Sequence, residues 1–416
     1  MNFNYKELGE CIELIIDHRG KTPKKMGGDW VSQGVRTISA KNVHGGNLDN
    51  IDSIRCVTQE VYKKWMKEDI KRGDCLLASE GATLGENLYW NSDEKVVIGQ
   101  RLYCIRTNKN ILDSKYFSAY MNTNEYQKEI KGRATGTSVL GIKQTDLLKT
   151  KVLVKDIHEQ RFIGDLYYGI NEKIEINNKI NKTLEEMAQA IFKQWFVDFE
   201  FPNEEGKPYR SSGGEMVESE LGMIPSSWVS KELKEVIKFT KGKKPKMIAD
   251  EEFYNSELYL TIDVLNRNSI QYAINDKVIL ANEKDILMVM DGASSGSLYY
   301  GLDGVVGSTL SKLVIKDKYI NEDILYYFLK LNEFNIKGNL TGSAIPHTDK
   351  EYVNRLVICI PTDRQLLDRA TKILSDIREK IIINNNEITK LINLRDTLLP
   401  KLMSGEIRVP LGSIEN

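Results

Sequence analysis

The chain has 416 residues, of which 41% are hydrophobic and 28% charged, and its formal net charge is −1. This composition is typical of globular proteins and excludes a disordered chain. It also excludes a uniformly basic nucleic-acid coat, although local basic patches determine binding more than net charge does. The length exceeds what one hydrophobic core usually serves, so we expect two to three domains.

Three features favour a cytoplasmic protein. The five cysteines show no paired spacing and are best explained as reduced thiols. The N-terminus from Met1 to Glu7 has no basic stretch followed by an apolar run, so no signal peptide is expected. The longest apolar runs, such as Ile286 to Met290, are too short to span a membrane. We therefore expect no membrane contact.

Residues 1–155 are predicted to form a first mixed α/β domain. Short apolar runs bounded by glycine are typical of buried strands. Such runs occur at Cys75–Ala78, Val96–Ile98 and Leu102–Ile105, and Tyr116–Ile130 is predicted to be a helix.

A change of pattern marks residues 156–200 as a long helix. Apolar and amide side chains recur in steps of four and three, which is a heptad seam. The seam positions are Ile170, Ile174, Asn177, Asn181, Leu184, Ala188, Ile191 and Trp195. A helix of about 40 residues is about 60 Å long at 1.5 Å per residue.

The rest of the chain follows the same plan. Residues 201–228 are rich in proline, glycine and serine and are predicted to be a linker. Residues 229–361 are predicted to form a second mixed domain, 362–405 a second long helix, and 406–416 a tail. Strands are expected at Ile286–Met290 and Leu310–Ile315, and a helix at Asn321–Leu331. The second seam contains Ile377, Ile381, Asn384, Ile388, Leu391, Arg395, Leu398 and Leu402.

The second half of the chain repeats motifs of the first in the same order. Gly20–Lys24 matches Gly242–Lys246, Asp74–Gly85 matches Asp285–Gly296, and Glu172–Asn178 matches Glu379–Asn385. A repeat of this size indicates a duplicated domain plus helix and not a solenoid. Each helix is too apolar along one stripe to stand alone in water. The predicted fold class is therefore α+β: two similar mixed domains, each followed by a long helix, with the helices paired as an antiparallel coiled coil and a pseudo-twofold internal repeat.

Asn177 and Asn384 occupy equivalent positions in the two seams. A buried asparagine costs stability unless it is hydrogen-bonded, but it can fix the register of a coiled coil. The two side chains therefore either set the helix register or face a polar gap or solvent.

Both helix ends and the segment between them carry specific motifs. The first helix ends with Leu184–Phe199, the segment that follows contains Ser219–Trp228, and the second helix ends with Leu394–Ile407. These stretches closely resemble the specificity (S) subunit of type I restriction-modification enzymes. In layout, the resemblance covers the whole chain, with two target recognition domains that are each followed by a long helix.

The resemblance implies a non-catalytic subunit that binds double-stranded DNA. Each recognition domain would read one half of a bipartite, asymmetric site. The paired helices would set the gap and bind two methyltransferase (M) subunits, which restriction (R) subunits can join. The methyltransferase subunits would bring S-adenosylmethionine, whereas this chain would bind no cofactor. The assembled complex would methylate adenine in DNA and, with restriction subunits, cleave DNA.

No catalytic or metal-binding residue is predicted. A DNA amino-methyltransferase needs a loop with two adjacent prolines to hold the target base, and none of the nine prolines here has a proline neighbour. Gly20–Thr22 is similar to the end of a P-loop, but Ile15 stands where the first glycine is required. The missing loops and the length disfavour an enzyme with fused methylation and cleavage domains. The other alternative is a structural adaptor with two protein-binding heads.

Basic loops are the candidates for phosphate contact, because DNA binding needs cations near the backbone. The first domain offers Arg19, Lys21, Thr22, Lys24 and Lys25, and the second offers Lys241, Lys243, Lys244 and Lys246. A charge run of this kind is also typical of a solvated face, so both interpretations stay open.

Polar residues that follow strands or flank glycine-rich turns are the candidate base readers. They are Lys41, Asn42, Ser79, Thr83, Gln100, Arg101, Arg133 and Thr135 in the first domain, and Thr261, Asp263, Ser294, Ser295, Thr309, Lys337, Asn339 and Thr341 in the second. Arginine is the commonest reader of guanine, and glutamine suits adenine. The alternative is that these positions only build tight turns.

An aromatic cluster at the end of the first helix is a candidate partner-binding site. Trp195, Phe196 and Phe199 lie close together there. Exposed aromatic clusters often anchor a partner protein. The alternative is that they pack against the opposite helix end or against a domain.

Overall fold

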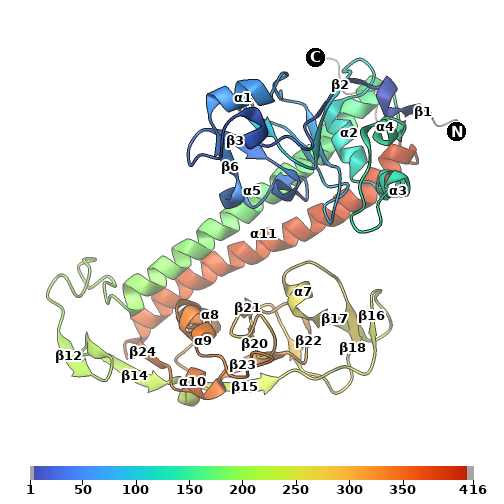
Figure 1. Ribbon diagram of the computed structural model, residues 1–416. Coiled ribbons are helices and arrows are strands. Elements are labelled where there is room, and N and C mark those ends of the chain that lie inside the picture. The colour runs from blue at the N-terminus through green and yellow to red at the C-terminus, as the bar shows by residue number, and fades with distance from the viewer. Residues whose placement is uncertain (1–3, 410–416) are drawn as a thin grey trace. The chain divides into compact units, whose positions relative to one another are not determined.

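The computed structural model describes residues 4–409, which divide into two compact units (Figure 1). Unit 1 runs to Ile176 and resumes at Ile388, and unit 2 is Asn177–Glu387. Each unit thus contains one predicted domain together with part of each long helix. Of the predicted tail, residues 410–416 lie outside the described residues.

The centre of unit 1 is an antiparallel sheet whose side chains alternate between two cores. Its strands, in spatial order, are β2 (Ile12–Asp17), β10 (Leu102–Thr107), β7 (Cys75–Ala78) and β8 (Asn87–Tyr89). Successive strand residues point to opposite faces. Tyr103 and Ile105 therefore pack against helices in one core, whereas Leu102 and Cys104 pack in the other.

The second core of unit 1 is closed by a smaller sheet and a short helix. The elements are β6 (Arg55–Val57), β3 (Val35–Ile38), β9 (Val97–Ile98) and α1 (Gln59–Trp65). Strands β3 and β9 run parallel, so their carboxyl ends meet at one edge. Strand β1 (Tyr5–Glu7) pairs with β11 (Lys151–Leu153), and β4 (Val43–His44) pairs with β5 (Asn47–Leu48). The unit also contains α4 (Gln144–Leu147) and the short 3₁₀ helices η1 (Leu8–Glu10), η2 (Lys24–Met26), η3 (Ala40–Asn42) and η4 (Ile51–Ser53).

The central sheet of unit 2 has the same strand order as that of unit 1, whereas its second sheet is larger. Its central sheet contains β15 (Ile237–Lys241), β23 (Leu310–Ile315), β20 (Ile286–Val289) and β21 (Leu298–Tyr300). Its second sheet contains β16 (Ile248–Ala249), β18 (Tyr272–Ile274), β17 (Ser256–Leu260), β22 (Gly304–Val306) and β19 (Leu280–Ala281). Strand β14 (Trp228–Glu232) pairs with β24 (Val357–Pro361) as β1 pairs with β11. The predicted duplication of a mixed domain is confirmed.

The stretch Tyr116–Ile130, predicted as one helix, is two helices. They are α2 (Ser114–Met121) and α3 (Asn124–Arg133). The break occurs because the Thr123 side chain accepts a hydrogen bond from the Tyr126 N–H and caps α3. In unit 2, α8 (Glu322–Leu331) is capped by Asn321, which the sequence had placed inside the helix. The other helices of unit 2 are α6 (Leu233–Val236), α7 (Ile262–Leu265), α9 (Glu333–Gly338) and α10 (Lys350–Asn354).

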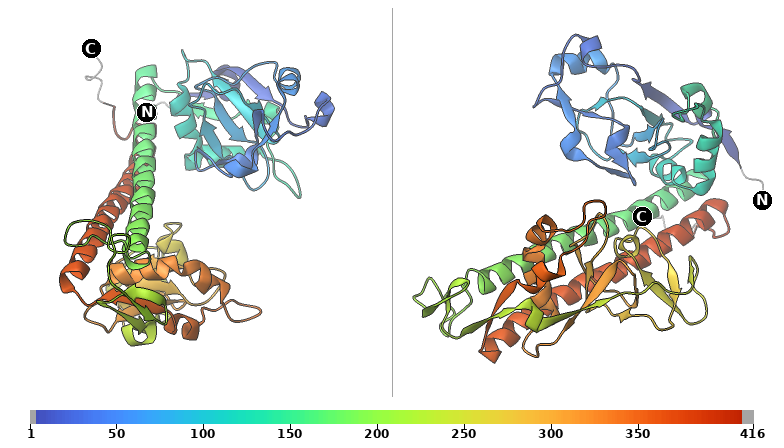
Figure 2. Two further views of the ribbon diagram at one scale, coloured as in Figure 1. Left: turned by 90° about the vertical axis from the view of Figure 1, so that its left-hand side faces the viewer. Right: turned by 60° about the horizontal axis from the view of Figure 1, so that its bottom comes forward.

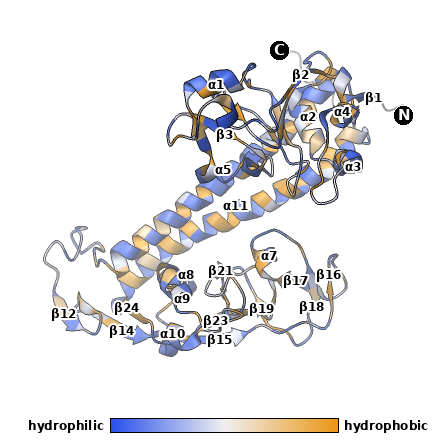
Figure 3. Cartoon of the chain, in the orientation of Figure 1, coloured by the Kyte–Doolittle hydropathy of each residue, from blue (hydrophilic) through white to orange (hydrophobic). Residues whose placement is uncertain are grey.

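Each unit also contains paired segments of the long helices α5 (Ile157–Phe196) and α11 (Arg364–Ser404) (Figures 1 and 2). In unit 1, Arg395 Nη1 donates to Asn171 Oδ1 at 2.8 Å. In unit 2, Asn177 Nδ2 donates to Glu387 Oε2 at 2.8 Å, and Asn384 Nδ2 donates to Asn181 Oδ1 at 2.8 Å. Residue numbers rise along one helix as they fall along the other, so the predicted antiparallel pairing is confirmed. Figure 3 shows apolar and polar residues alternating along both helices. Among the described residues, no helix is long and apolar enough to cross a membrane.

Asn177 and Asn384 are buried between the helices, with exposed fractions of 1% and 3%. Each donates its amide hydrogen to a polar side chain of the opposite helix. This geometry contradicts the alternative in which the two side chains face solvent. Sliding one helix along the other would break both hydrogen bonds, which supports a role in setting the register.

Replacing Asn384 by alanine is expected to lower the free energy of unfolding by about 1–2 kcal/mol, because a buried hydrogen bond between the helices is lost. Asn386 provides a matched control because its side chain is exposed. The Asn386→Ala variant should unfold within about 0.5 kcal/mol of the parent chain. Urea titration followed by circular dichroism would measure both values, and equal destabilisation of the two variants would contradict the buried role.

Residues 201–228 form part of unit 2, which corrects the prediction of a linker. Phe201, Ile224 and Trp228 are buried in the main core of the unit. Strands β12 (Met216–Ser219) and β13 (Gly222–Pro225) form a hairpin. The glycines of this segment serve its turns, as at Gly222, where the backbone has a φ of 85°.

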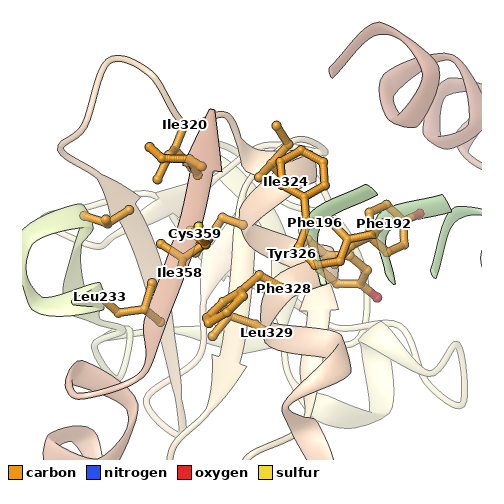
Figure 4. Close-up of a cluster of buried hydrophobic side chains, with 14 of the residues drawn as sticks. Phe192, Phe196, Leu233, Ile320, Ile324, Tyr326, Phe328, Leu329, Ile358 and Cys359 are labelled. Atoms are coloured by element: carbon orange, nitrogen blue, oxygen red, sulfur yellow. The ribbon is translucent and has the colours of Figure 1, made fainter. Parts of the chain in front are cut away.

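The main core of unit 2 includes the end of α5 and the start of α11. Phe192 and Phe196 of α5 stack with their ring centroids 4.8 Å apart. Figure 4 shows both rings beside side chains of α8, including Ile324 and Tyr326. In unit 1, Leu402 of α11 belongs to the core that contains the helices α2 and α3. Each core is thus completed by helix ends that are far apart in the sequence.

Candidate nucleic-acid interface

A cleft of about 810 Å³ lies at the edge of unit 1 where the carboxyl ends of β3 and β9 meet. It brings together seven of the predicted site residues, namely Lys21, Thr22, Lys24, Lys41, Thr83, Gln100 and Arg101. These residues come from four separate stretches of the sequence. Residues that are distant in the sequence thus form one concave surface.

The lining of the cleft is rich in cations. Lys21 Nζ donates to the Trp65 carbonyl at 3.2 Å, and Lys41 Nζ donates to the Ser53 carbonyl at 3.3 Å. Both acceptors are backbone carbonyls, so neither lysine is paired with an acid in these contacts. The lining contains three lysines and two arginines but only Asp29 and Glu80 as acids. Such a balance suits an anionic ligand such as a phosphate backbone.

Two lining residues that the sequence did not indicate form a stacked pair. The Arg55 guanidinium lies over the Trp30 ring, 3.9 Å from its centroid. Arginine and tryptophan in this arrangement attract each other through the ring quadrupole and offer a flat surface to a ligand. They are 25 positions apart on different elements, and no motif in the sequence links them.

Two cations of the first basic loop, Arg19 and Lys25, make other contacts and lie outside the cleft. Arg19 pairs with Asp17 at 2.7 Å, and Lys25 Nζ donates to the Gly20 carbonyl at 2.7 Å. Burial raises the pKa of the Asp17 carboxyl, but hydrogen bonds from Arg19 outweigh it and leave that pKa below its usual value. Neither Arg19 nor Lys25 lines the cleft. The neighbouring His18 is buried, which lowers its pKa to about 4 and leaves the imidazole neutral at pH 7.

In unit 2 the equivalent basic loop is partly neutralised. Lys241 and His347 both contact Asp291, at 3.0 and 2.8 Å. Burial raises the Asp291 pKa, but these two partners outweigh it and hold the pKa below its usual value. Lys246 pairs with Asp276 at 2.6 Å. Lys243 and Lys244 are exposed and have no ion-pair partner among the residues that the structure describes.

Four predicted base readers are committed to the fold, which corrects their assignment. Asn42 and Ser79 are fully buried, and the Asn42 amide donates to the loop 49–53. Ser295 is buried, and its hydroxyl donates to the Gly292 and Pro346 carbonyls. Thr261 caps α7 by accepting a hydrogen bond from the Val264 N–H. Polar residues beside tight turns often satisfy backbone groups in this way.

The other candidates lie at the surface with varied partners. Arg133 pairs with Glu129 at 2.8 Å, and Lys337 pairs with Glu333 at 2.6 Å, both within one helical turn. The Asn339 amide donates to the Asn335 carbonyl, and the Thr341 hydroxyl donates to the His347 carbonyl. Four more residues are exposed or half-exposed and make no side-chain hydrogen bond among the residues that the structure describes: Thr135, Asp263, Ser294 and Thr309. None of these eight residues lines the cleft of unit 1.

The partner-binding prediction for Trp195, Phe196 and Phe199 is wrong. All three side chains are buried in the main core of unit 2. The rings of Phe196 and Phe199 lie 5.5 and 5.3 Å from the Trp228 ring. The cluster is covered because the segment that contains Trp228 folds onto the helix end.

Comparison with known proteins agrees with this architecture. The family model described as type I restriction modification DNA specificity domain matches residues 1–186 and 225–393. The MjaVIII specificity subunit of Methanocaldococcus jannaschii is 34% identical over 184 residues, which cover 44% of this chain and 43% of that subunit. The MjaIX specificity subunit of the same organism is 28% identical over 301 residues, which cover 69% of this chain and 66% of that subunit. The matches thus span less than two thirds of both relatives.

Two further proteins match over most of their length. The HindI specificity subunit of Haemophilus influenzae is 23% identical over 416 aligned positions, covering 82% of this chain and 88% of that one. The crystal structure of a type I restriction-modification S subunit from M. genitalium superposes with a TM-score of 0.62 and 16% identity, and it covers 96% of both chains. This second match shows the same fold. Because the family model matches once in each half and covers most of the chain, this chain belongs to the type I restriction-modification DNA specificity family.

Proposed function

We propose that this chain is the DNA sequence-specificity subunit of a type I restriction-modification complex. The main support for this proposal is the set of residues that line the cleft of unit 1. It places lysines suited to phosphates beside Gln100, Thr83 and Arg101, whose side chains suit base edges. Unit 2 has the same framework with different polar residues, as two heads that read different halves of one site require.

The experiment is selection of duplexes by the complex of this chain with its methyltransferase partner. A pool of randomised DNA is bound, competed with random duplex and sequenced. We expect a bipartite motif with two dissimilar halves and a fixed gap. Recovery of unselected sequences, with the complex intact, would reject DNA reading and favour the alternative of an adaptor with two protein-binding heads.

We further infer that methyl transfer is performed by the partner, which would bind S-adenosylmethionine. The sequence lacks the loop with two adjacent prolines by which a DNA amino-methyltransferase holds its target base. The purified chain, given labelled S-adenosylmethionine and DNA, should transfer no label, whereas addition of the methyltransferase subunit should restore transfer. Transfer by the chain alone would overturn this assignment.

Two exposed apolar side chains at equivalent positions of the long helices support the binding of two methyltransferase subunits. Met187 of α5 lies in unit 2, and Leu394 of α11 lies in unit 1. They are separated by 207 residues, the same offset that separates Glu172 from Glu379. The Met187 and Leu394 side chains are 49% and 46% exposed. An exposed apolar side chain at the same place on each helix offers each of two identical partners an equivalent contact.

The stoichiometry of the complex tests this assignment. Met187→Glu or Leu394→Glu alone should reduce the bound methyltransferase subunits from two to one, and the double variant should bind none, as counted by native mass spectrometry. Asn178→Glu, an exposed position on another side of α5, is the control and should keep two. If the double variant still binds two methyltransferase subunits, the subunits bind at another surface.

The lysines of the second basic loop are expected to bind phosphates without sequence preference. The change of Lys243 and Lys244 to alanine should weaken specific and random duplexes alike. It should also make the slope of log affinity against log salt concentration shallower by up to about 1.8, since each phosphate contact contributes about 0.9 to that slope. Lys246→Ala is the control and should change the slope less, because Asp276 already offsets that charge. An unchanged slope in the double variant would assign these lysines to a solvated face.

A further inference from the structure

The turn between β9 and β10 projects Gln100 and Arg101 from a fixed backbone at the wall of the cleft. The Ser79 N–H donates to the Arg101 carbonyl at 2.9 Å, and the Ala40 N–H donates to the Gln100 carbonyl at 3.3 Å. The Gly99 N–H donates to the Ile38 carbonyl at 2.7 Å. The turn is therefore tied to the ends of β3 and β7, and its side chains leave the protein at a defined place.

Arg101 adopts a backbone conformation that side chains other than glycine seldom adopt. Its φ is 61°, in the left-handed region. Neighbouring hydrogen bonds hold the residue there, and such residues gather where a side chain must be aimed. This conformation directs the Arg101 side chain toward Glu80, which lies beyond the end of β7.

The Glu80 carboxylate holds only one edge of the Arg101 guanidinium. Arg101 Nε lies 2.8 Å from Glu80 Oε1. The two terminal nitrogens, Nη1 and Nη2, have no hydrogen-bond partner among the described residues, and the Arg101 side chain is 55% exposed. The ion pair leaves this planar pair of donors available and restrains the orientation of the guanidinium.

That pair of donors matches one base edge in the major groove. Guanine offers two adjacent acceptors there, N7 and O6, whereas adenine, cytosine and thymine each offer at most one acceptor beside a donor or a methyl group. The cations Lys21, Lys24 and Lys41 line the same cleft and can hold the adjoining backbone. We propose that Arg101 reads a guanine in the half-site of unit 1 and that Glu80 is the residue that positions its guanidinium. This assignment rests on the proposed function.

Unit 2 has the same turn without this reader. The Met290 N–H donates to the Thr309 carbonyl at 2.7 Å, and the Gly307 N–H donates to the Leu260 carbonyl at 3.0 Å, as in unit 1. Thr309 stands in place of Arg101. Asp291 stands in place of Glu80, and its carboxylate already contacts Lys241 and His347. The proposal therefore applies to one half-site only.

Duplex selection with the complete complex tests the proposal in three variants. Arg101→Ala should lose roughly 5- to 150-fold discrimination at one guanine of one half-site, leaving the other half-site and the gap unchanged. Arg101→Lys keeps the charge but not the paired donors, so it should lose discrimination at the same position. Glu80→Gln should reduce the discrimination at that guanine by a smaller factor than either Arg101 variant. Thr309→Ala is the matched control and should leave that guanine fully specified.

The outcomes separate this proposal from the function on which it rests. If the parent complex selects no motif, the proposed function fails. If the parent selects a bipartite motif but Arg101→Ala weakens all duplexes alike while Arg101→Lys restores binding, Arg101 only contacts phosphate and the guanine assignment is overturned. A parent motif without guanine in either half overturns it as well. Retention of the unaffected half-site in each variant shows that the protein is folded.

Discussion

Replacing Phe192 by alanine should lower the free energy of unfolding of unit 2 by about 3–5 kcal/mol. The Phe192 side chain is 1% exposed, and it packs on Phe196 in the main core of the unit. Removal of a buried ring costs its transfer free energy together with the cavity that remains. The core also contains Trp195 and Trp228, so tryptophan fluorescence during urea denaturation reports on this region directly.

Phe334 provides a matched control in the same unit. Its ring is 87% exposed. The Phe334→Ala variant should unfold within about 0.5 kcal/mol of the parent chain. A loss of several kcal/mol in this control, or a loss below about 1 kcal/mol for Phe192→Ala, would contradict the packing described here.

Lengthening both long helices by one heptad should widen the gap between the two half-sites by about three base pairs. Seven residues add about 10 Å of helix, and base pairs are stacked at about 3.4 Å. The insertions belong between Ile176 and Asn177 and between Glu387 and Ile388, because these two places are the boundaries between the units. A full heptad keeps the seam in phase on both helices. Because DNA is helical, each recognition domain must also still face its groove, so we expect the gap to widen by between about two and four base pairs.

Sequencing of duplexes selected by the complex would measure the gap. An insertion of seven residues in α5 alone is the control, since it shifts one helix against the other and should abolish the motif. If the paired insertion leaves the gap unchanged while both half-sites are still selected, the helices do not set the spacing and serve only to bind partners.

The long helices could be predicted from the sequence because their signal is local. A heptad seam repeats every seven residues, so the helix predicted at 156–200 is observed at Ile157–Phe196. The equivalence of the two seam asparagines, Asn177 and Asn384, could be predicted from the same repeat. Recurrence of motifs in the same order likewise predicts two similar domains without any knowledge of strand pairing.

The individual side chains of the site were harder to predict because their roles depend on residues that are distant in the sequence. Asn42 looked like an accessible amide, yet its hydrogen bonds to Asn50 and Ser53 are satisfied inside the protein. For the aromatic cluster at Trp195 the sequence left partner binding and packing against a domain both open, because the segment that covers the cluster has the composition of a linker. Its proline and glycine content indicates turns, but composition alone does not distinguish a turn packed on a core from a flexible connection.

The distribution of the core residues has a consequence for synthesis of the protein. Leu402 and Met403, near the end of the chain, belong to the core of unit 1, which also contains Leu8. Unit 2 is formed from one uninterrupted stretch, Asn177–Glu387. A ribosome therefore releases every residue of unit 2 before it has released all of unit 1. The core of unit 1 can be completed only after the end of α11 has been synthesised. We therefore expect unit 2 to fold first during translation.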